Sequence, residues 1–420
     1  MDRFVIEGGT KLTGKVIVSG AKNSALPIIA ASLLTDKKVV IENVPDVMDV
    51  HTMIELMEYI GSQIEFKKNV LTIYTPKIKR FDAPYNIVRK MRASYYVLGA
   101  LIAREKKARV SLPGGCAIGP RPVDLHIKGI KSLGCDIDID QGYIVANCKN
   151  LKGATINLQG AKGTSVGATI NVMLAATGAR GVTRINCAAC EPEVVDVANF
   201  LNKLGVNING AGTNQITVRG NWCPNEICYR IIPDRIETGT FAVAAVITGG
   251  DITIKESQPE HLTTVMDKLR EVGADVNVGT DEIVVKGNKL VKPADIFVAP
   301  YPGFPTDMQA QFMALLSIAS GTSIIKETIF ENRFMQAVEL SRMGANITLE
   351  GDTAMVKGVK ALKGATVMAS DLRASACLVL AGLVARGKTY IRRIYHLDRG
   401  YERFEKKLAE LGARIKRIKE

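Results

Sequence analysis

The sequence predicts an α/β protein built from six similar units, and three observations carry this prediction. Of the 420 residues, 47% are hydrophobic but only 5% are aromatic, which favours closely packed helices and sheets over an aromatic-rich β-sandwich. A motif of amphipathic helix, glycine and alternating strand recurs at intervals of 68 to 73 residues. A second, almost wholly apolar helix falls midway between these motifs. Because the chain is too long for one typical domain, we expect two groups of three units.

The recurring motif ends each amphipathic helix at a glycine. Glycine adopts the left-handed conformation at little cost, so it suits the position just past a helix end. The alternating apolar residues that follow are typical of half-buried strands. The six glycines are Gly61, Gly134, Gly205, Gly273, Gly344 and Gly412.

The second class of helix is apolar on nearly every side and rich in alanine and glycine, so we expect it to be buried. These helices span 23–34, 92–104, 165–177, 238–247, 307–320 and 370–385. Their few polar residues gather at their starts, where unpaired amide groups and the helix dipole favour anions. If the helices of a group run parallel, these ends meet and form a site for phosphate and carboxylate groups. The residues concerned are Lys22, Asn23, Arg92, Asp307, Asp371 and Arg373.

Residues 113–125 form a glycine-rich stretch, Pro-Gly-Gly-Cys-Ala-Ile-Gly-Pro-Arg-Pro-Val-Asp-Leu, that carries a single cysteine. Basic neighbours make a thiol more acidic, so Cys116 near Arg121 suits proton donation to an anionic substrate. Taken alone, the stretch is equally compatible with a surface turn that holds an incidental cysteine.

The formal net charge is +13, yet the basic residues are scattered and no aromatic platform is interleaved with them. A small polyanionic substrate is therefore favoured over nucleic acid.

Residues 414–419 alternate basic and apolar side chains, which is typical of an edge strand. No signal segment and no apolar run of about 20 residues is present, so we expect a cytoplasmic protein without membrane insertion.

The eight cysteines include the pair Cys187 and Cys190, but no second ligand pair accompanies it, so a metal site is not indicated. We expect most of the cysteines to be reduced and buried as small hydrophobic residues.

Each polar residue at the helix starts also has an explanation that needs no substrate. Lys22 could be a solvated loop lysine, and Asp307 could be a first-turn or capping acid. Asp371 and Arg373 could form a surface ion pair of little energetic value. The coincidence of these residues at equivalent positions of the repeat favours a common site.

Four residues elsewhere carry similar alternatives. Arg333 could simply neutralise Glu331, and Arg399 could form a salt bridge at a helix start. His126 and His396 fit packing or capping better than catalysis.

Eight segments distributed over the whole chain resemble the enolpyruvyl transferase family. They lie at 20–24, 91–94, 113–116 with 121–126, 165–169, 304–311, 329–335, 371–374 and 395–402. The resemblance implies two inside-out α/β barrel domains, each of three βαβαββ repeats, with the ligand cleft between them. The implied N-terminal domain spans 22–230, and the implied C-terminal domain combines 1–21 with 231–420.

The resemblance also implies the reaction, which is transfer of the enolpyruvyl (1-carboxyvinyl) group of phosphoenolpyruvate to the 3-hydroxyl of UDP-N-acetylglucosamine. Phosphate is released by addition and elimination, in the first committed step of bacterial peptidoglycan synthesis. No metal or organic cofactor is implied, and the epoxide fosfomycin is an expected inactivator. An enzyme acting on shikimate 3-phosphate, an RNA-binding or RNA-end-processing protein and an inactive relative are the alternatives.

Roles for individual residues follow from the same resemblance. Cys116 is the implied proton donor and site of a covalent adduct, and Asp307 is the implied base near the sugar hydroxyl, with Lys22 and Arg399 completing the catalytic set. The implied phosphoenolpyruvate ligands are Lys22, Asn23, Cys116, Arg121 and Arg399. The implied UDP-sugar contacts are Asn23, Arg92, Arg121, Pro122, Val123, Asp124, Leu125, Ser165, Val166, Gly167, Asp307 and Ile329. Further residues of the implied cleft are Arg333, Asp371 and Arg373. Where some members carry a lysine, this chain has Gly163, with Lys162 one residue earlier.

Overall fold

A computed structural model describes residues 2–112 and 123–419, which divide into two compact units. Of the described residues, one unit holds 20–112 and 123–232, and we call it the Lys22 unit. The other holds 2–19 and 233–419, and we call it the Asp307 unit. Each unit has its own hydrophobic core. Within the described ranges, no helix combines the length and apolar character needed to cross a membrane.

Among the described residues, each unit contains three four-stranded sheets, and each sheet belongs to one βαβαββ repeat. In every repeat the first two strands pair in parallel and the last two pair antiparallel. One repeat of the Lys22 unit consists of β6 (Asp82–Ala83), α4 (Tyr96–Glu105), β7 (Lys107–Ser111), α5 (Asp124–Ser132), β8 (Asp136–Asp140) and β9 (Tyr143–Asn147). Its sheet order is β6-β7-β9-β8.

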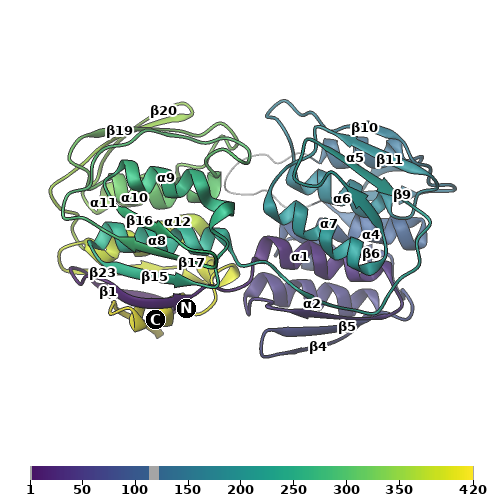
Figure 1. Ribbon diagram of the computed structural model, residues 1–420, viewed down its shortest axis with the longest axis horizontal. Helices are drawn as coiled ribbons and strands as arrows, with labels where there is room; N and C mark the ends of the chain where they lie inside the picture. The colour runs from purple at the N-terminus through teal and green to yellow at the C-terminus, as the bar shows by residue number, and fades with distance from the viewer. Residues whose placement is uncertain (1, 113–122, 420) are drawn as a thin grey trace. The chain divides into compact units, whose positions relative to one another are not determined.

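The other two repeats of the Lys22 unit follow the same plan (Figure 1). One consists of β10 (Thr155–Asn157), α6 (Val166–Ala176), β11 (Val182–Asn186), α7 (Pro192–Leu204), β12 (Asn207–Asn209) and β13 (Gln215–Arg219). The last takes its first strand, β14 (Ile227–Arg230), from a distant part of the chain. Its remaining elements are α1 (Lys22–Ala31), β3 (Lys38–Glu42), α2 (Met48–Ile60), β4 (Gln63–Lys67) and β5 (Val70–Tyr74). A short helix α3 (Tyr85–Val88) precedes α4.

In the Asp307 unit, strands from the start of the chain complete two of the three repeats. The first repeat has β2 (Thr13–Ile17), α8 (Arg235–Thr248), β15 (Asp251–Lys255), α9 (Thr263–Glu271), β16 (Asp275–Val278) and β17 (Glu282–Lys286). The second has β18 (Ile296–Phe297), α10 (Gln309–Leu316), β19 (Thr322–Lys326), α11 (Met335–Arg342), β20 (Asn346–Glu350) and β21 (Thr353–Lys357). The third has β22 (Thr366–Met368), α12 (Leu372–Val384), β23 (Lys388–Arg392), α13 (Phe404–Glu410), β24 (Arg414–Lys419) and β1 (Asp2–Glu7). As predicted, β24 is an edge strand of its sheet.

The six repeat glycines all have the conformation that the sequence predicts. Each follows an amphipathic helix of its repeat, and the φ angles lie between 90° and 127°. A residue with a side chain is strained there, so these glycines end the helices and turn the chain toward the next strand.

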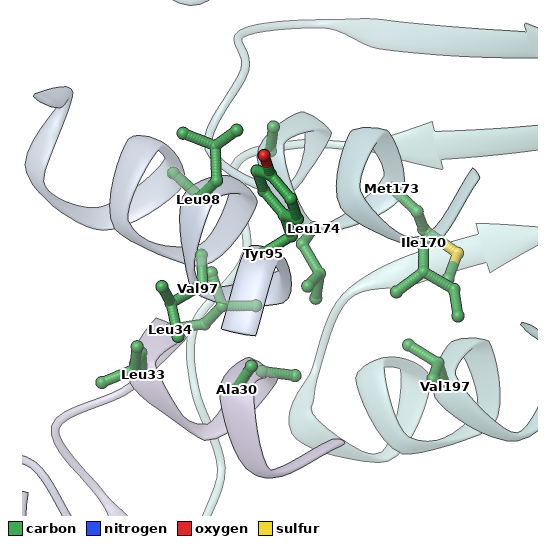
Figure 2. Close-up of a cluster of buried hydrophobic side chains, with 14 of the residues drawn as sticks. Ala30, Leu33, Leu34, Tyr95, Val97, Leu98, Ile170, Met173, Leu174 and Val197 are labelled. Carbon is green, nitrogen blue, oxygen red and sulfur yellow. The ribbon is translucent and has the colours of Figure 1, made fainter. Parts of the chain in front are cut away.

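The predicted apolar helices are buried and pack against one another inside each unit. In the Lys22 unit, α4 approaches α6 so closely that a Cβ on Gly99 would lie 2.3 Å from the carbonyl oxygen of Asn171. The Asn171 side chain fastens this contact, since its oxygen accepts from Gly99 N at 2.7 Å and its amide donates to Tyr95 O at 2.9 Å. Figure 2 shows the surrounding core, with Leu98 of α4 and Met173 of α6.

Hydrogen bonds at the C-terminal ends of these helices show that they run parallel. Arg104, at the end of α4, donates to the carbonyl oxygens of Leu33 and Thr35 just past α1, at 2.8 and 2.9 Å. Lys106 donates to the carbonyl oxygen of Gly178 just past α6, at 3.2 Å. The N-terminal ends of α1, α4 and α6 therefore share the opposite end of the unit.

The three buried helices of the Asp307 unit are joined near their starts. The Gln311 amide of α10 donates to Thr240 Oγ1 of α8 at 3.1 Å. Asp307, in the 3₁₀ turn that leads into α10, contacts Arg373 in the first turn of α12. Polar side chains at these starts can therefore act together, as the repeat pattern suggests.

The expectation that the cysteines are buried is wrong for most of the described free ones. Cys187 and Cys190 are half-buried and Cys223 and Cys228 are exposed, whereas Cys377 alone among the described free cysteines is buried. The exposed pair lies on and just before β14, an edge strand, where an outward position is open to solvent. Cys135 and Cys148, which flank the β8–β9 hairpin, form a disulfide that the spacing alone does not predict.

Candidate active site

Polar residues gather at the N-terminal ends of the buried helices in both units, and we describe the two clusters separately. Cys116, Arg121 and Pro122, which the resemblance assigns to the site, lie outside the described residues. The other assigned residues fall in or next to one of the two clusters.

In the Lys22 unit, the central contact is a buried ion pair. Lys22 is the first residue of α1, and its Nζ lies 3.0 Å from Oδ2 of Asp49 in the first turn of α2. The two side chains are only 11% and 5% exposed, so the alternative of a solvated loop lysine is wrong. Nothing in the sequence pattern singled out Asp49, because an acid in a first helical turn is common.

Asn23 and Arg92 lie at the same end of the unit as this pair. Asn23 is half-buried on α1, and Arg92 begins the 3₁₀ turn Arg92–Tyr95 that leads into α4. The Arg92 guanidinium carbon lies 5.9 Å from the centre of the Tyr95 ring. Since α1 and α4 are parallel, both residues belong to the end of the unit where the helix dipoles favour anions.

The start of α6 presents backbone groups to the same end of the unit. Ser165 caps the helix, and its Oγ accepts from Ala168 N at 3.2 Å. Val166 and Gly167 form the first turn, whose remaining amide groups suit an anion such as a diphosphate. A Cβ on Gly167 would lie 3.3 Å from the imidazole of His126, so this turn rests directly on that ring.

His126 has a packing role, as the simpler interpretation predicts. It is 7% exposed, and its Nδ1 lies 3.0 Å from the amide nitrogen of Asn171. Just before it, Val123 precedes α5, Asp124 is exposed and Leu125 is half-buried. Leu125 Cδ1 lies 3.0 Å from the position that a Cβ on Gly160 would take, so α5 contacts the turn at 160–163. This turn holds the exposed Lys162 and the half-buried Gly163.

In the Asp307 unit, the central feature is one carboxylate between two guanidinium groups. Arg333 Nη2 lies 2.5 Å from Asp307 Oδ1, and Arg373 Nη2 lies 2.8 Å from Asp307 Oδ2. The arginine side chains are 8% and 6% exposed, and the aspartate side chain is 26% exposed. The cluster of these three residues has one more positive than negative charge.

The arginines control the protonation state of the aspartate. Burial alone raises the pKa of the Asp307 carboxyl, but Arg373 and Arg333 outweigh burial and hold this pKa well below its usual range. Asp307 is therefore a carboxylate whose two oxygens are both engaged. A base needs an oxygen within hydrogen-bond reach of the proton that it accepts, and each oxygen of this partly exposed carboxylate can accept a further hydrogen bond beside its arginine.

Two of the simpler interpretations are wrong for this unit. The Arg373 side chain is buried against Asp307 and does not form a surface ion pair with Asp371. Asp371 instead caps α12, accepting from Arg373 N and Ala374 N at 2.9 and 3.0 Å. Arg333 binds Asp307 and donates to Thr306 Oγ1 at 3.0 Å, so it does more than neutralise Glu331.

Two assigned residues remain: Ile329 lies half-buried in the segment after β19, and Arg399 lies in a 3₁₀ helix. Arg399 is half-buried at the end of the 3₁₀ helix Ile394–Arg399. The preceding residue, Asp398, is held by two hydrogen bonds from Arg417 of β24, at 2.6 and 3.0 Å. In the same helix, His396 stacks on Tyr395 with ring centres 4.3 Å apart, which fits a packing role.

Comparisons with known proteins identify the family of the chain. Residues 6–408 match the family model described as EPSP synthase (3-phosphoshikimate 1-carboxyvinyltransferase). A UDP-N-acetylglucosamine 1-carboxyvinyltransferase of Desulfosudis oleivorans is 54% identical over 418 residues, with each chain fully covered. One of Yersinia pestis is 52% identical over 421 residues, again with full coverage of both chains.

Solved structures show the same fold. The enolpyruvyl transferase NikO from Streptomyces tendae has a TM-score of 0.90 and 26% identity, covering 99% of both chains. An EPSP synthase from Acinetobacter baumannii has a TM-score of 0.76 and 19% identity, covering both chains completely. The chain belongs to the enolpyruvyl transferase family, and the predicted pair of α/β domains built from βαβαββ repeats is confirmed.

Proposed function

We propose that the protein transfers the enolpyruvyl group of phosphoenolpyruvate to the 3-hydroxyl of UDP-N-acetylglucosamine and releases phosphate, as a step of peptidoglycan synthesis. The observation that carries the proposal is the buried, cation-rich cluster of Asp307, Arg333 and Arg373, which can hold an anion beside a potential base. The names of relatives that are 51–54% identical over the whole chain supply the choice of substrates.

In the proposed reaction the sugar 3-hydroxyl oxygen bonds to carbon 2 of phosphoenolpyruvate while carbon 3 gains a proton. The resulting tetrahedral adduct then loses a proton from carbon 3 and expels phosphate, which leaves the enol ether. Cys116 donates the first proton, since a thiol is both acidic and polarisable. Lys22, Arg121 and Arg399 offset the charge of the phosphate and carboxylate groups.

Asp307 acts in this proposal as the base for the sugar hydroxyl. The resting ion pairs with Arg333 and Arg373 occupy both of its oxygens. An incoming substrate anion competes for one guanidinium, and this raises the pKa of Asp307 toward its usual range, so the carboxylate accepts the hydroxyl proton more readily. Asp307 is therefore a stronger base when the anionic substrate is bound.

The strongest alternative is an enzyme that acts on shikimate 3-phosphate, the activity in the family model's description. The solved EPSP synthase is only 19% identical to this chain, whereas the UDP-N-acetylglucosamine enzymes exceed 50%. The stretch around Cys116 also favours the sugar nucleotide, because the resemblance places that loop only in this branch.

An assay of phosphate release decides between these substrates. The purified protein should release inorganic phosphate from phosphoenolpyruvate with UDP-N-acetylglucosamine and not with shikimate 3-phosphate. Mass spectrometry should find the enolpyruvyl sugar nucleotide in equal amount. Release with shikimate 3-phosphate alone would replace this proposal by its alternative, and release with neither acceptor would favour an inactive relative.

A cytoplasmic location and activity without a cofactor are parts of the same proposal. The resemblance implies activity without a cofactor. Phosphate release that survives exhaustive dialysis against a metal chelator would support the second point, and loss of activity that Mg²⁺ or Zn²⁺ restores would contradict it.

A further inference from the structure

Glu327 is a buried carboxylate that the proposed reaction does not use. It directly follows β19 and is 2% exposed. Its Oε1 accepts from the backbone nitrogens of Ile329 and Phe330, at 2.8 and 3.2 Å. Its Oε2 accepts from the hydroxyl of Thr306 at 2.7 Å. A carboxylate is costly to bury unless its oxygens are hydrogen-bonded, and these three donors meet that need.

From Glu327 a chain of contacts leads to the carboxylate of Asp307. Arg333 Nη1 donates to Thr306 Oγ1 at 3.0 Å, and Arg333 Nη2 contacts Asp307 Oδ1 at 2.5 Å. A guanidinium only donates and a carboxylate only accepts, so the direction of the chain is fixed. The Thr306 hydroxyl accepts from Arg333 and donates to Glu327.

A second route joins the same residues. The backbone of Phe330 is held by Glu327, and its ring lies 5.2 Å from the Arg333 guanidinium carbon. Ile329, which the resemblance assigns to the UDP-sugar, is one of the two residues whose backbone nitrogens donate to Glu327. The buried carboxylate of Glu327 thus contacts Thr306, which binds Arg333, and also the backbone at Ile329.

Comparison of the six repeats shows that this turn is a departure from the common pattern. The residue directly after the second strand has a φ angle of 52° to 59° in four repeats, at Asn43, Cys187, Glu256 and Arg393. Among the described residues, only Glu327 and Leu112 at this position lack a positive φ. These two precede the segments that hold the assigned residues Ile329 and Cys116.

We propose that Glu327 is a positioning residue that holds Arg333 against Asp307 through Thr306 and fixes the backbone at Ile329. The inference rests on the proposed function and adds to it a residue that contacts neither substrate. An arginine side chain has many rotamers, so a buried partner that fixes one of them pre-organises the groups around Asp307. The contacts of Glu327 form two branches. The Thr306 branch, which leads through Arg333 to Asp307, acts on the reacting groups. The Ile329 branch, which is the hydrogen bond to the backbone of Ile329, acts on nucleotide binding.

The two branches can be separated by substitution. Thr306→Val removes the hydroxyl at nearly constant volume and leaves the turn at Ile329 intact. It should lower kcat about 10- to 100-fold with little change in KM for UDP-N-acetylglucosamine. Thr306→Ser, which keeps the hydroxyl, should recover most of kcat. Glu327→Gln cannot accept from all three donors, so it should lower kcat and also raise that KM.

Two matched controls test whether these effects are specific. Glu256 is also a glutamate directly after a second strand, but it is exposed and has a positive φ, so Glu256→Gln should behave as the wild type. Thr328 is the neighbour of Glu327 in sequence, and its hydroxyl donates to Val298 O at 2.8 Å. Thr328→Val removes this hydroxyl, which takes no part in the hydrogen bonds that join Glu327, Thr306 and Arg333. It should also leave kcat unchanged.

A readout that needs no turnover separates the inference from the proposed function. The carboxyl carbon resonance of Asp307, assigned by its loss in Asp307→Asn, should titrate at higher pH in Thr306→Val than in the wild type, and Thr306→Ser should restore it. Suppose that the wild type shows no enolpyruvyl transfer and that the Asp307 titration still shifts in Thr306→Val as stated. The proposed function then fails, and the positioning role stands. If Thr306→Val matches the wild type in kcat and in titration, the positioning role is overturned.

Discussion

The ammonium group of Lys22 lies 3.0 Å from Asp49 Oδ2, and both side chains are almost completely buried. An ammonium group removed from water needs such a partner, because an unpaired buried charge is strongly unfavourable. The pair keeps a desolvated cation in place at the start of α1, so in the proposed reaction Lys22 needs little further loss of water to meet the substrate anion. Asp49 is thus a support of the assigned ligand Lys22.

Asp49→Asn should destabilise the protein while keeping the shape of the side chain. The substitution leaves the Lys22 ammonium buried beside a neutral amide, and we expect the free energy of unfolding to fall by about 3 kcal/mol. The single tryptophan, Trp222, lies in the same unit and donates to Thr177 O, so its fluorescence reports unfolding of that unit in urea.

The double variant Lys22→Met/Asp49→Leu separates stability from activity. Replacing both members of a buried pair by apolar residues of similar size is often neutral. We expect the double variant to be more stable than Asp49→Asn and yet to release no phosphate. A double variant less stable than the single one would show that the pair is not what limits stability here.

Asp307→Asn should remove a pH-dependent contribution to stability. Because Arg373 and Arg333 outweigh burial, the folded-state pKa of Asp307 lies below the unfolded value of about 3.9. The stabilising contribution of Asp307 is therefore fully present at pH values above its unfolded-state pKa, and it is lost as the pH falls through its folded-state pKa. In calorimetry, the stability gap between wild type and Asp307→Asn should be constant from about pH 8 to 5 and narrow below about pH 4. A gap that widens in acid would contradict this.

Fosfomycin should inactivate the protein by alkylating Cys116, as the resemblance implies. Cys116→Ser should resist, because a hydroxyl is far less nucleophilic than a thiolate. Cys223→Ser, at an exposed cysteine, is the matched control and should stay sensitive. Mass spectrometry of the treated protein should find one adduct, on the peptide that contains residue 116. A fosfomycin adduct that still forms on Cys116→Ser would refute this assignment.

The repeat could be read from the sequence because its signals are local. A glycine after a helix, such as Gly205, ends that helix whatever the rest of the fold does, and its φ of 118° follows the rule. The same holds for α12, whose apolar stretch and capping Asp371 are adjacent in the chain. The sequence therefore placed Lys22, Asp307 and Arg373 at helix starts.

The partners of these residues could not be read from the sequence, because they depend on distant packing. Asp307 and Arg373 are 66 residues apart, and only the parallel alignment of α10 and α12 brings them together. Glu327 follows an ordinary strand and resembles the exposed Glu256 until its neighbours are known. Asp49 is similar, since its burial depends on α1. The disulfide between Cys135 and Cys148 depends on the register of β8 and β9.

Asp196 of α7 provides a pH dependence of the opposite sign. Its carboxylate accepts from Tyr229 Oη at 2.5 Å, and burial raises its pKa to about 6. The folded value then exceeds the unfolded value of about 3.9. Above about pH 6 the buried carboxyl group is ionised in the folded state, and its full unfavourable contribution to stability is present. This contribution decreases as the pH falls, and it is absent below about pH 4, where the group is protonated in both states.

Asp196→Asn should therefore stabilise the protein at pH 8 and lose this advantage in acid. The asparagine oxygen can still accept from Tyr229, and no charge has to be buried, so the gain is up to about 3 kcal/mol at pH 8. Urea unfolding followed by Trp222 fluorescence should show the gain shrinking as the pH falls from about 6 to 4. Asp138→Asn, at an exposed position of β8, is the control and should show no such trend. A gain that grows toward acid would mean that the buried carboxylate is favourable as an anion, because its hydrogen bonds then outweigh its loss of water.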